Sequence, residues 1–584
     1  MGASRSPADR VAPSRPLSPR LGWFSWVDAV VAAGLLVLLY VVIRLGKDVT
    51  LSFTPTQVIG IDTDPARLPY YAGRSLLRMF AALGVSLVFA LVWAYAAAHS
   101  RRLERVLIPA LDILQSVPVL AFLTVAVTGF VALFPGSLLG LELASVFAIF
   151  TSQAWNMAFA FYHSLITTPR ELDELSRGMG FSRWMRFWKV ELPSGAIGLV
   201  WNAMMSFGGG WFFLVASELI SVSNREYALP GVGSYAGAAI AAGNLGHVGW
   251  AILTMAILVI GVNFLFWRPL TAWAERFKVE QSEAAQVQRS LVLDFLRRAN
   301  WPRLLGRALA PLRESAGRAG RVFGVDDRPL LVDVRRRRAG DVLFTVVTLA
   351  LIGWGLVSLV GYLAGRPAGL SIFVEPLLLG LATLARVVVL VAVATLIWVP
   401  IGVKIGFSPR LTRIAQPVVQ ILASFPANFL FPLATWLFLR TGLSLNFGGI
   451  LLMALGAQWY ILFNVIAGAM AIPTDLREAM DDLGVHGRHR WKRLIIPGVF
   501  PSYVTGAITA SGGAWNASIV AEVVTFGGTT LTATGLGAYI AHATAAGDHP
   551  RLLAGVAVMS MYVVLINRLF WRRLYRLAEH RYSL

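Results

Sequence analysis

Long apolar runs are the feature that most constrains how this chain can fold. Each run has about the length, ~20 residues, that a helix needs to cross a lipid bilayer. In lipid, a helix satisfies every backbone hydrogen bond within its own segment, so we expect an all-α polytopic membrane protein with twelve transmembrane helices. The runs lie near 26–43, 72–98, 107–133, 140–167, 195–220 and 247–267, and then near 341–363, 377–403, 414–438, 447–471, 499–524 and 552–567.

Composition excludes several other classes of protein. Hydrophobic residues make up 57% of the 584 residues and charged residues only 14%, which is not typical of a soluble globular protein. The net charge of +20 does not indicate nucleic-acid binding, because the positive residues lie in loops and not on a soluble domain. The chain has no cysteine, which excludes disulfides, thiolate catalysis and cysteine-based metal sites.

The distribution of basic residues predicts the orientation in the membrane. Most of the 51 Lys and Arg residues fall in loops that share one side if the N-terminus is cytoplasmic. Basic loops are retained on the cytoplasmic side, so we expect a multi-pass protein of the bacterial inner membrane with both termini in the cytoplasm. These loops are 1–20, 99–107, 168–193, 268–340, 404–413, 473–497 and 567–584.

The two halves of the chain are repeats of each other. Most matches lie 304 residues apart, and nearer the start of each half the offset becomes 308. Each half has an even number of expected spans, so the two should pack as a parallel pair with a solute path between them. Matched pairs include Trp155 and Trp459, Gly180 and Gly484, Gly209 and Gly513, Gly231 and Gly535, Tyr235 and Tyr539, and, at the second offset, Arg78 and Arg386, Ser116 and Ser424, and Pro118 and Pro426.

The repeat suggests four segments. Residues 1–24 are polar and rich in Pro, Ser and Arg, so we expect a disordered cytoplasmic N-terminus. Residues 25–268 and 341–584 are each expected to form a domain of six transmembrane helices. The basic segment 269–340 between them is expected either to lie along the inner leaflet as amphipathic helix, binding membrane lipid, or to form a solvated tether.

A polar, basic loop occurs once in each half, at Glu174 to Pro193 and at Glu478 to Pro497. In both copies a Gly follows the Glu by six residues and a Pro follows the Gly by thirteen, with aliphatic residues just before the Pro. A single copy would suggest an ordinary cytoplasmic loop. Two copies at equivalent places in the membrane pattern favour a shared function.

These loops resemble the cytoplasmic loop of binding-protein-dependent ABC importer permeases of the type I fold. That loop has a Glu-Ala-Ala triplet, three residues, Gly, nine residues and Ile-x-Leu-Pro. The first copy departs from the triplet at Leu175 and Ser176. The resemblance implies a short helix, a turn at the Gly, and a Pro near the start of the next span. The residues implied to couple to an ATPase subunit are Glu174, Gly180, Leu192 and Pro193, and Glu478, Ala479, Gly484, Ile496 and Pro497.

Each half also resembles the branch of these permeases for nitrate, sulfonates such as taurine, and bicarbonate. The similarity covers about 70–267 and 376–572, including Glu218 followed by Gly231-Val-Gly233 and Glu522 followed by Gly535-Leu-Gly537. Such permeases are usually separate subunits, and here two are fused. The resemblance implies two ATPase subunits, a periplasmic or lipid-anchored binding protein, and a small anion as solute.

No nucleotide-binding motif occurs in the chain. Its Gly-Lys pair, Gly46-Lys47, is followed by Asp48 and lacks the upstream Gly of a phosphate-binding loop. We therefore expect no cofactor and no enzyme activity on this chain, with ATP and Mg on the partner subunits. His486 and His489 lie in the second loop and are not expected to bind metal.

The fifth span of each half is the main candidate for the solute path. It is rich in Gly and carries Trp211 or Trp515 near mid-membrane, where either Trp would line the path or pack between helices. Directly after the Trp, the first half has Phe212, Phe213 and Leu214. The second half has Asn516, Ala517 and Ser518, so a site between the halves would have one apolar wall and one hydrogen-bonding wall.

Further candidates lie along the same spans. Glu218 and Glu522 end the fifth spans, where a carboxylate can reach water, so they would gate the outer mouth or cap the interface. Arg78 and Arg386 would attract an anion, or else snorkel or pair with a Glu. The aligned pair Ser116 and Ser424 completes the set of path candidates.

Two other functions remain open. Twelve spans in two parallel halves also describe ion-coupled secondary transporters, which would leave the duplicated loops without a purpose and would require carboxylates in mid-membrane. A membrane-embedded enzyme is the third alternative, but no convergent catalytic set occurs in the sequence.

Overall fold

The computed structural model describes residues 26–50, 60–277 and 369–581, with short gaps at 117–118, 169, 223–224 and 527, and scattered positions from 342 to 365. We call 60–277 the first half and 369–581 the second half. The predictions for the N-terminal segment 1–24 and for most of the basic linker lie outside the described residues.

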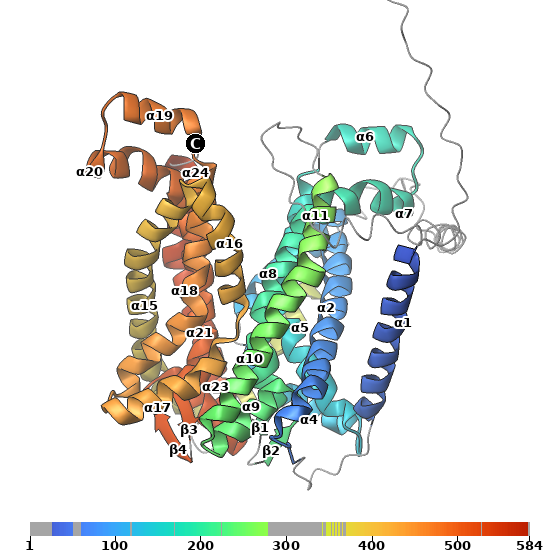
Figure 1. The fold of residues 1–584 in the computed structure, drawn as a ribbon, viewed down its shortest axis with the longest axis vertical. Helices are drawn as coiled ribbons and strands as arrows, with labels where there is room; N and C mark the ends of the chain where they lie inside the picture. Colours follow the sequence, from blue (N-terminus) through green and yellow to red (C-terminus); the bar gives the residue numbers. More distant parts are fainter. Residues whose placement is uncertain are drawn as a thin grey trace, which may run out of the picture.

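Each half is a bundle built on four long helices (Figure 1). Within the described residues, eight helices are long and apolar enough to cross a membrane, and one bent pair makes a ninth. The expected count of twelve stays a prediction, because α1 (Trp26–Lys47) is not among these nine and the predicted span at 341–363 is only partly described. The four helices are α2 (Leu68–His99), α5 (Leu139–Ile166), α8 (Leu192–Glu218) and α10 (Leu245–Val262) in the first half, and α15 (Val374–Gly406), α18 (Leu445–Ala471), α21 (Ile496–Ala521) and α23 (His549–Ile566) in the second.

The span predicted at 414–438 is broken. Helix α16 (Pro409–Ser424) ends before Pro426, and a 3-10 turn leads into α17 (Phe431–Thr441) at a bend of 79°. Pro426 has no N–H and disfavours helical backbone at Phe425, which is extended with φ −72° and ψ 127°. In the first half, the predicted span 107–133 is described as α3 (Arg101–Ser116) and α4 (Val119–Leu133), with residues 117–118 between them outside the described part.

Short elements that sequence analysis did not predict follow the fifth spans. Antiparallel hairpins β1–β2 and β3–β4 come directly after α8 and near the end of α21, and each is followed by a short helix. In Figure 1 both hairpins lie at one end of the molecule, which we call the hairpin end. Their bounds are β1 (Leu219–Val222), β2 (Arg225–Ala228), α9 (Val232–Ala241), β3 (Val523–Phe526), β4 (Thr529–Thr532) and α22 (Leu536–Ala546).

The opposite end, which we call the loop end, carries the duplicated polar loops (Figure 1). They fold as α6 (Arg170–Gly178) with α7 (Arg183–Arg186), and as α19 (Thr474–Asp482) with α20 (Gly487–Arg490). Both halves therefore run in the same direction, as a parallel pair requires. The last helix of the first half continues from α10 through a π-helical turn into α11 (Arg268–Ala274) and on to Phe277, beyond the expected boundary at 268.

The halves exchange elements across their interface. Helices α3 and α4 of the first half contact α23 and α21, and Ala126 and Val127 of α4 are buried in the core of the second half. Reciprocally, α16 contacts α10 and α8, and Phe429 is buried in the core of the first half. Equivalent helices of the two repeats thus make equivalent contacts with the other half, as in a two-fold interface between identical subunits.

Candidate functional site: coupling loops, buried ion pairs and the midline between the halves

The two polar loops have the same backbone geometry. Gly180 has φ +68° and Gly484 has φ +65°, in the left-handed region where residues other than Gly are strained. In the second loop, Val485 N–H donates to Met480 C=O at 2.9 Å, which closes the end of the short helix as in a Schellman motif. Pro193 and Pro497 lie at the starts of α8 and α21, each directly after a π-helical turn, so the missing N–H falls where the helical hydrogen-bond pattern changes.

Apolar side chains are exposed on these loops. Leu175 and Met179, four residues apart around α6, are 59% and 63% exposed, and Leu483 after α19 is 77% exposed. Glu174, Glu478 and Ala479 are exposed as well. Clustered exposed apolar residues beside charged ones are typical of a surface that binds another protein.

A buried cluster of four charges lies near the hairpin end of the first half. The carboxylate of Glu218 accepts hydrogen bonds from Arg78 Nη1 at 2.7 Å and from Ser75 Oγ at 2.5 Å. Arg78 Nε also donates to Glu142 at 2.5 Å, and Arg74 pairs with the same Glu142. Since every charge has an opposite partner, the cluster is formally neutral.

The second half has a smaller cluster at the aligned positions. Glu522 accepts from Arg386 Nη1 at 2.7 Å and from Thr383 Oγ1 at 2.8 Å. Arg386 also donates to Asn446 Oδ1 at 2.9 Å. Asn446 aligns with Glu142, and Ala382 aligns with Arg74, so one positive and one negative charge have been removed together.

The two carboxylates, Glu218 and Glu522, therefore do not lie where the sequence led us to expect them. Glu218 and Glu522 are 0% exposed and do not reach water, and Arg78 and Arg386 are only 2% and 7% exposed. Their charges are tolerated in the membrane because each Arg pairs with the Glu of its own half. This corrects the expectation of water-accessible carboxylates, and it agrees with the alternative that the Arg residues pair with Glu.

The same carboxylates explain the glycines that follow them. Gly233 N–H donates to Glu218 at 2.7 Å, so this carboxylate stabilises the N-terminus of α9. A Cβ on Gly231 would lie 2.2 Å from a Glu218 oxygen, and one on Gly535 would lie 2.3 Å from a Glu522 oxygen. Glu218 and Glu522 thus join the fifth span, the second span and the short helix at the hairpin end.

Both tryptophans are buried inside their own halves. Trp211 is 1% exposed and its ring contacts Phe207 edge to face, with the ring centroids 5.6 Å apart. Trp515 is also 1% exposed and stacks on Tyr562 at 5.8 Å. Of the two roles considered for these residues, the geometry favours packing between helices.

Two residues of the predicted hydrogen-bonding wall, Ser518 and Asn516, bond to the backbone of their own helix. Ser518 is fully buried and donates to Trp515 C=O, while Asn516 donates to Gly512 C=O at 3.2 Å. On the first-half side, Phe212 and Phe213 pack against the core of the second half. Ser116 ends α3, and its side chain lies outside the described part of the structure.

The polar contacts between the halves come from other residues, on α16 and on the 3-10 turn after it, where Asn428 Nδ2 donates to Phe212 C=O at 3.3 Å. Gln420 Nε2 lies 2.8 Å from Met204 Sδ and donates to Asn263 Oδ1 at 3.4 Å. Ser424, a predicted path residue, lies so close to α8 that a Cβ on Gly208 would be 2.6 Å from its Oγ. Ser424 therefore does lie at the midline between the halves.

A small cavity of about 30 Å³ marks this midline. That volume holds about one or two water molecules, so this cavity does not hold a larger solute in this conformation. The described residues that line it include no charged side chain. They are Met204 and Met205 of the first half and Gln420, Ala423, Ser424, Trp459, Tyr460 and Phe463 of the second.

Sequence analysis missed Glu142, Gln420 and Tyr460. The repeat could have identified two of them, because Glu142 aligns with Asn446 and Tyr460 aligns with Asn156. Aligned positions with different residue types mark where the two halves differ. Tyr460 also lies near an aligned glycine pair, 3.5 Å and 3.6 Å from Cβ positions built on Gly209 and Gly513. Gln420 had no comparable signal in the pattern of spans.

In a comparison with known protein families, the same family model matches two separate parts of the chain. The model of the binding-protein-dependent transport system inner membrane component matches residues 86–272 and again 398–583. Similar proteins include a putative ABC transporter permease of Methanocaldococcus jannaschii, 25% identical over 186 residues. A nitrate import permease of Leptolyngbya laminosa is 24% identical over 188 residues, and a taurine transport system permease of Escherichia coli is 26% identical over 186 residues.

Each of these alignments covers 32% of this chain and between 64% and 66% of the relative's own length. The relatives thus match about one repeat, whereas the family model matches both. Together with the paired loops and the parallel halves, the two matches show a fusion of two permease domains. The chain belongs to the family of binding-protein-dependent transport system inner membrane components.

Proposed function

We propose that this chain is the complete membrane channel of an ATP-driven importer, with one permease domain in each half. The observation that carries the proposal is the duplicated loop, folded alike at the same end of both halves with apolar side chains exposed. Two ATPase subunits would bind there, one to α6 and α7 and one to α19 and α20. ATP and Mg would be held on those subunits.

The loop end is then cytoplasmic, in agreement with the positive-inside distribution, and both termini are cytoplasmic as well. The hairpin end faces outward, where a periplasmic or lipid-anchored binding protein would deliver the solute. Nitrate and taurine appear in the names of similar permeases, and bicarbonate in that of another, 27% identical over 216 residues. We infer a small anion of this kind as the solute.

The solute path runs between the halves, past Gln420, Ser424 and Tyr460. Because the midline cavity is uncharged, it would bind a solute through hydrogen bonds and not through a fixed positive charge. The cavity is too small for taurine, so transport requires the halves to separate there. ATPase closure at the loop end would supply this movement through alternating access.

The competing function, ion-coupled secondary transport, has less support. It needs a carboxylate that exchanges a proton or ion during transport, and in the described residues Glu142, Glu218 and Glu522 are each paired with an Arg of the same half. The duplicated loops would also have no purpose in such a protein.

The test is to change one coupling loop at a time. Gly180→Glu or Gly484→Glu places a charged side chain at the exposed turn, where a Cβ meets nothing within 4 Å. We expect each variant to fold but to lose solute transport and the stimulation of ATP hydrolysis by solute. Gly442→Glu, at the glycine after α17 that has φ +69° and no neighbour within 4 Å, is the control matched in charge and backbone strain, and it should transport normally. Unchanged transport in both loop variants would refute the proposal.

A further inference from the structure

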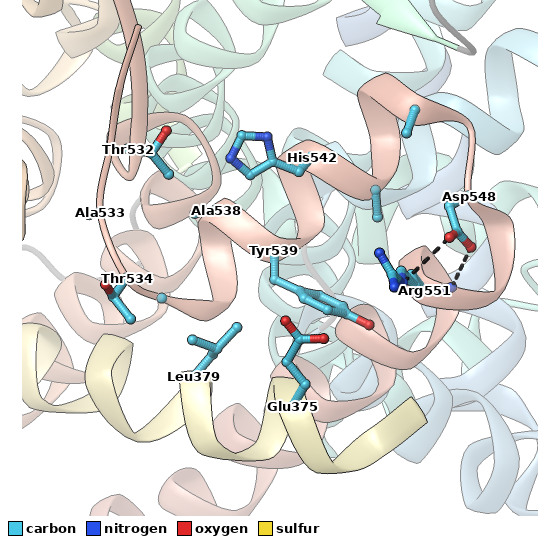
Figure 2. A pocket seen from close by; sticks show the side chains of 13 residues that line it. Glu375, Leu379, Thr532, Ala533, Thr534, Ala538, Tyr539, His542, Asp548 and Arg551 are labelled. Carbon is cyan, nitrogen blue, oxygen red and sulfur yellow. Dashed lines mark hydrogen bonds and ion pairs between the residues drawn. The ribbon is translucent and has the colours of Figure 1, made fainter. Parts of the chain in front are cut away.

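A second cavity opens at the hairpin end of the second half, away from the midline. Its volume is about 420 Å³, within the range of about 300–1,000 Å³ usual for small-molecule sites. It lies between the start of α15, one face of α22 and the start of α23 (Figure 2). The titratable side chains that line it are Glu375, Tyr539, His542, Asp548 and Arg551.

The first half fills the corresponding space with an aromatic side chain. Leu379, which lines the cavity, aligns with Tyr71, and Tyr539 aligns with Tyr235. The rings of Tyr71 and Tyr235 lie 6.2 Å apart and Tyr235 is completely buried, whereas Tyr539 is 9% exposed. The cavity therefore results from a difference between the repeats and is not an unavoidable feature of the fold.

One side of the cavity is suited to an ammonium group. Figure 2 shows the Glu375 carboxylate pointing toward the ring of Tyr539. No ion pair of Glu375 is found within the described part of the chain, and its side chain lines the cavity. A carboxylate beside an aromatic ring binds ammonium ions through charge and through cation–π attraction.

The other side is suited to an acidic group. His542 lies on α22 one turn from Tyr539, and Arg551 lies at the start of α23. Arg551 Nε lies 3.6 Å from Asp548, which leaves other N–H groups of the guanidinium for an anion. The aligned positions in the first half are Ala238 and His247, so this half has fewer groups that bind anions.

We propose that this cavity binds a small zwitterion, an aminosulfonate or amino acid, with its ammonium group at Glu375 and Tyr539 and its acidic group at His542 and Arg551. The site is distinct from the midline path, and its test measures binding and not transport. A result that refutes the importer proposal would therefore not refute zwitterion binding in this cavity, and a result that refutes zwitterion binding would not refute the importer proposal.

The experiment titrates the purified full-length chain with taurine by calorimetry in lipid nanodiscs. Two matched ligands each lack one charge: isethionate has a hydroxyl in place of the ammonium, and ethylammonium lacks the sulfonate. We expect saturable taurine binding and at least about tenfold weaker binding of both analogues, since each loses a charge-assisted hydrogen bond. Equal binding of either analogue, or no taurine binding, would overturn the proposal.

Variants then locate the site. Glu375→Gln should weaken taurine binding at least about tenfold while leaving isethionate binding unchanged. Leu379→Tyr copies the first half and should close the cavity, and Tyr71→Leu is its control at the aligned position. Taurine binding that survives Leu379→Tyr, or that is lost equally in Tyr71→Leu, would show that taurine binds elsewhere.

Discussion

The difference between the two buried charge clusters allows a sharp test of how they are held in the membrane. Glu142 pairs with Arg74 and Arg78, whereas the aligned Asn446 accepts from Arg386 and from the Thr534 N–H, and Ala382 stands in place of Arg74. We predict that Glu142→Asn alone is strongly destabilising. Among the described residues, it leaves Arg74 with the Leu45 carbonyl, which accepts from its Nη1 at 2.6 Å.

The expected magnitude follows from burial. Arg74 is 1% exposed, and leaving one partner of a buried ion pair uncompensated costs about 3–5 kcal/mol. The double variant Glu142→Asn with Arg74→Ala reproduces the second half and restores neutrality. We expect it to lose only about 1–2 kcal/mol relative to the unchanged chain, which corresponds to the missing packing of the Arg side chain.

The assay is a double-mutant cycle on the free energy of unfolding, measured by denaturant titration in mixed micelles. The reverse change is a control in the other half: Asn446→Glu alone should destabilise, and adding Ala382→Arg should recover part of the loss. If the destabilisation of the first-half pair were simply additive, Arg74 and Glu142 would not compensate each other and the reasoning would be wrong.

Three further predictions concern single positions. Gly231→Ala should destabilise by about 1–3 kcal/mol, because the new Cβ would lie 2.2 Å from the Glu218 carboxylate, whereas Gly84→Ala, with open space around it, should not; thermal unfolding of both variants decides this. Gly484→Ala should destabilise the coupling turn by about 1–2 kcal/mol, because the turn has φ +65°, and Gly484→Asn should destabilise it by less. Protease should therefore cleave that loop faster in the Ala variant than in the Asn variant. Gln420→Leu should raise the KM for solute without lowering basal ATP hydrolysis in the assembled complex; a loss of basal hydrolysis would place its role in folding or docking instead.

The sequence was sufficient for the parallel repeats and the local fold of the loops. Length and apolarity identify helices in lipid, and the resemblance of the duplicated loops to those of importer permeases implied a short helix, a turn at the Gly and a span that starts near the Pro. The break before α17 was missed, although Pro426 was a visible signal for it, because an apolar run of the right length suggested one continuous span. The hairpins were missed because their short strands carry no clear alternation.

Side-chain partners were harder to predict, because they depend on which face of each helix meets its neighbour. The sequence placed Glu218 at the end of a span and suggested access to water, but the fold brings Ser75 and Arg78 from the second span against it. Likewise Trp211 lies near mid-membrane along its helix, yet its ring points into its own half. Position along a helix was predictable, whereas rotation about its axis was not.

The most direct test of the central claim is to purify the tagged full-length chain from its native membrane and identify what binds it. The account predicts two copies of an ATPase subunit for each chain, lost from the complex when Gly180→Glu and Gly484→Glu are combined, and ATP hydrolysis that solute stimulates. A chain that purifies alone and moves a solute down an ion gradient would contradict the account and establish a secondary transporter.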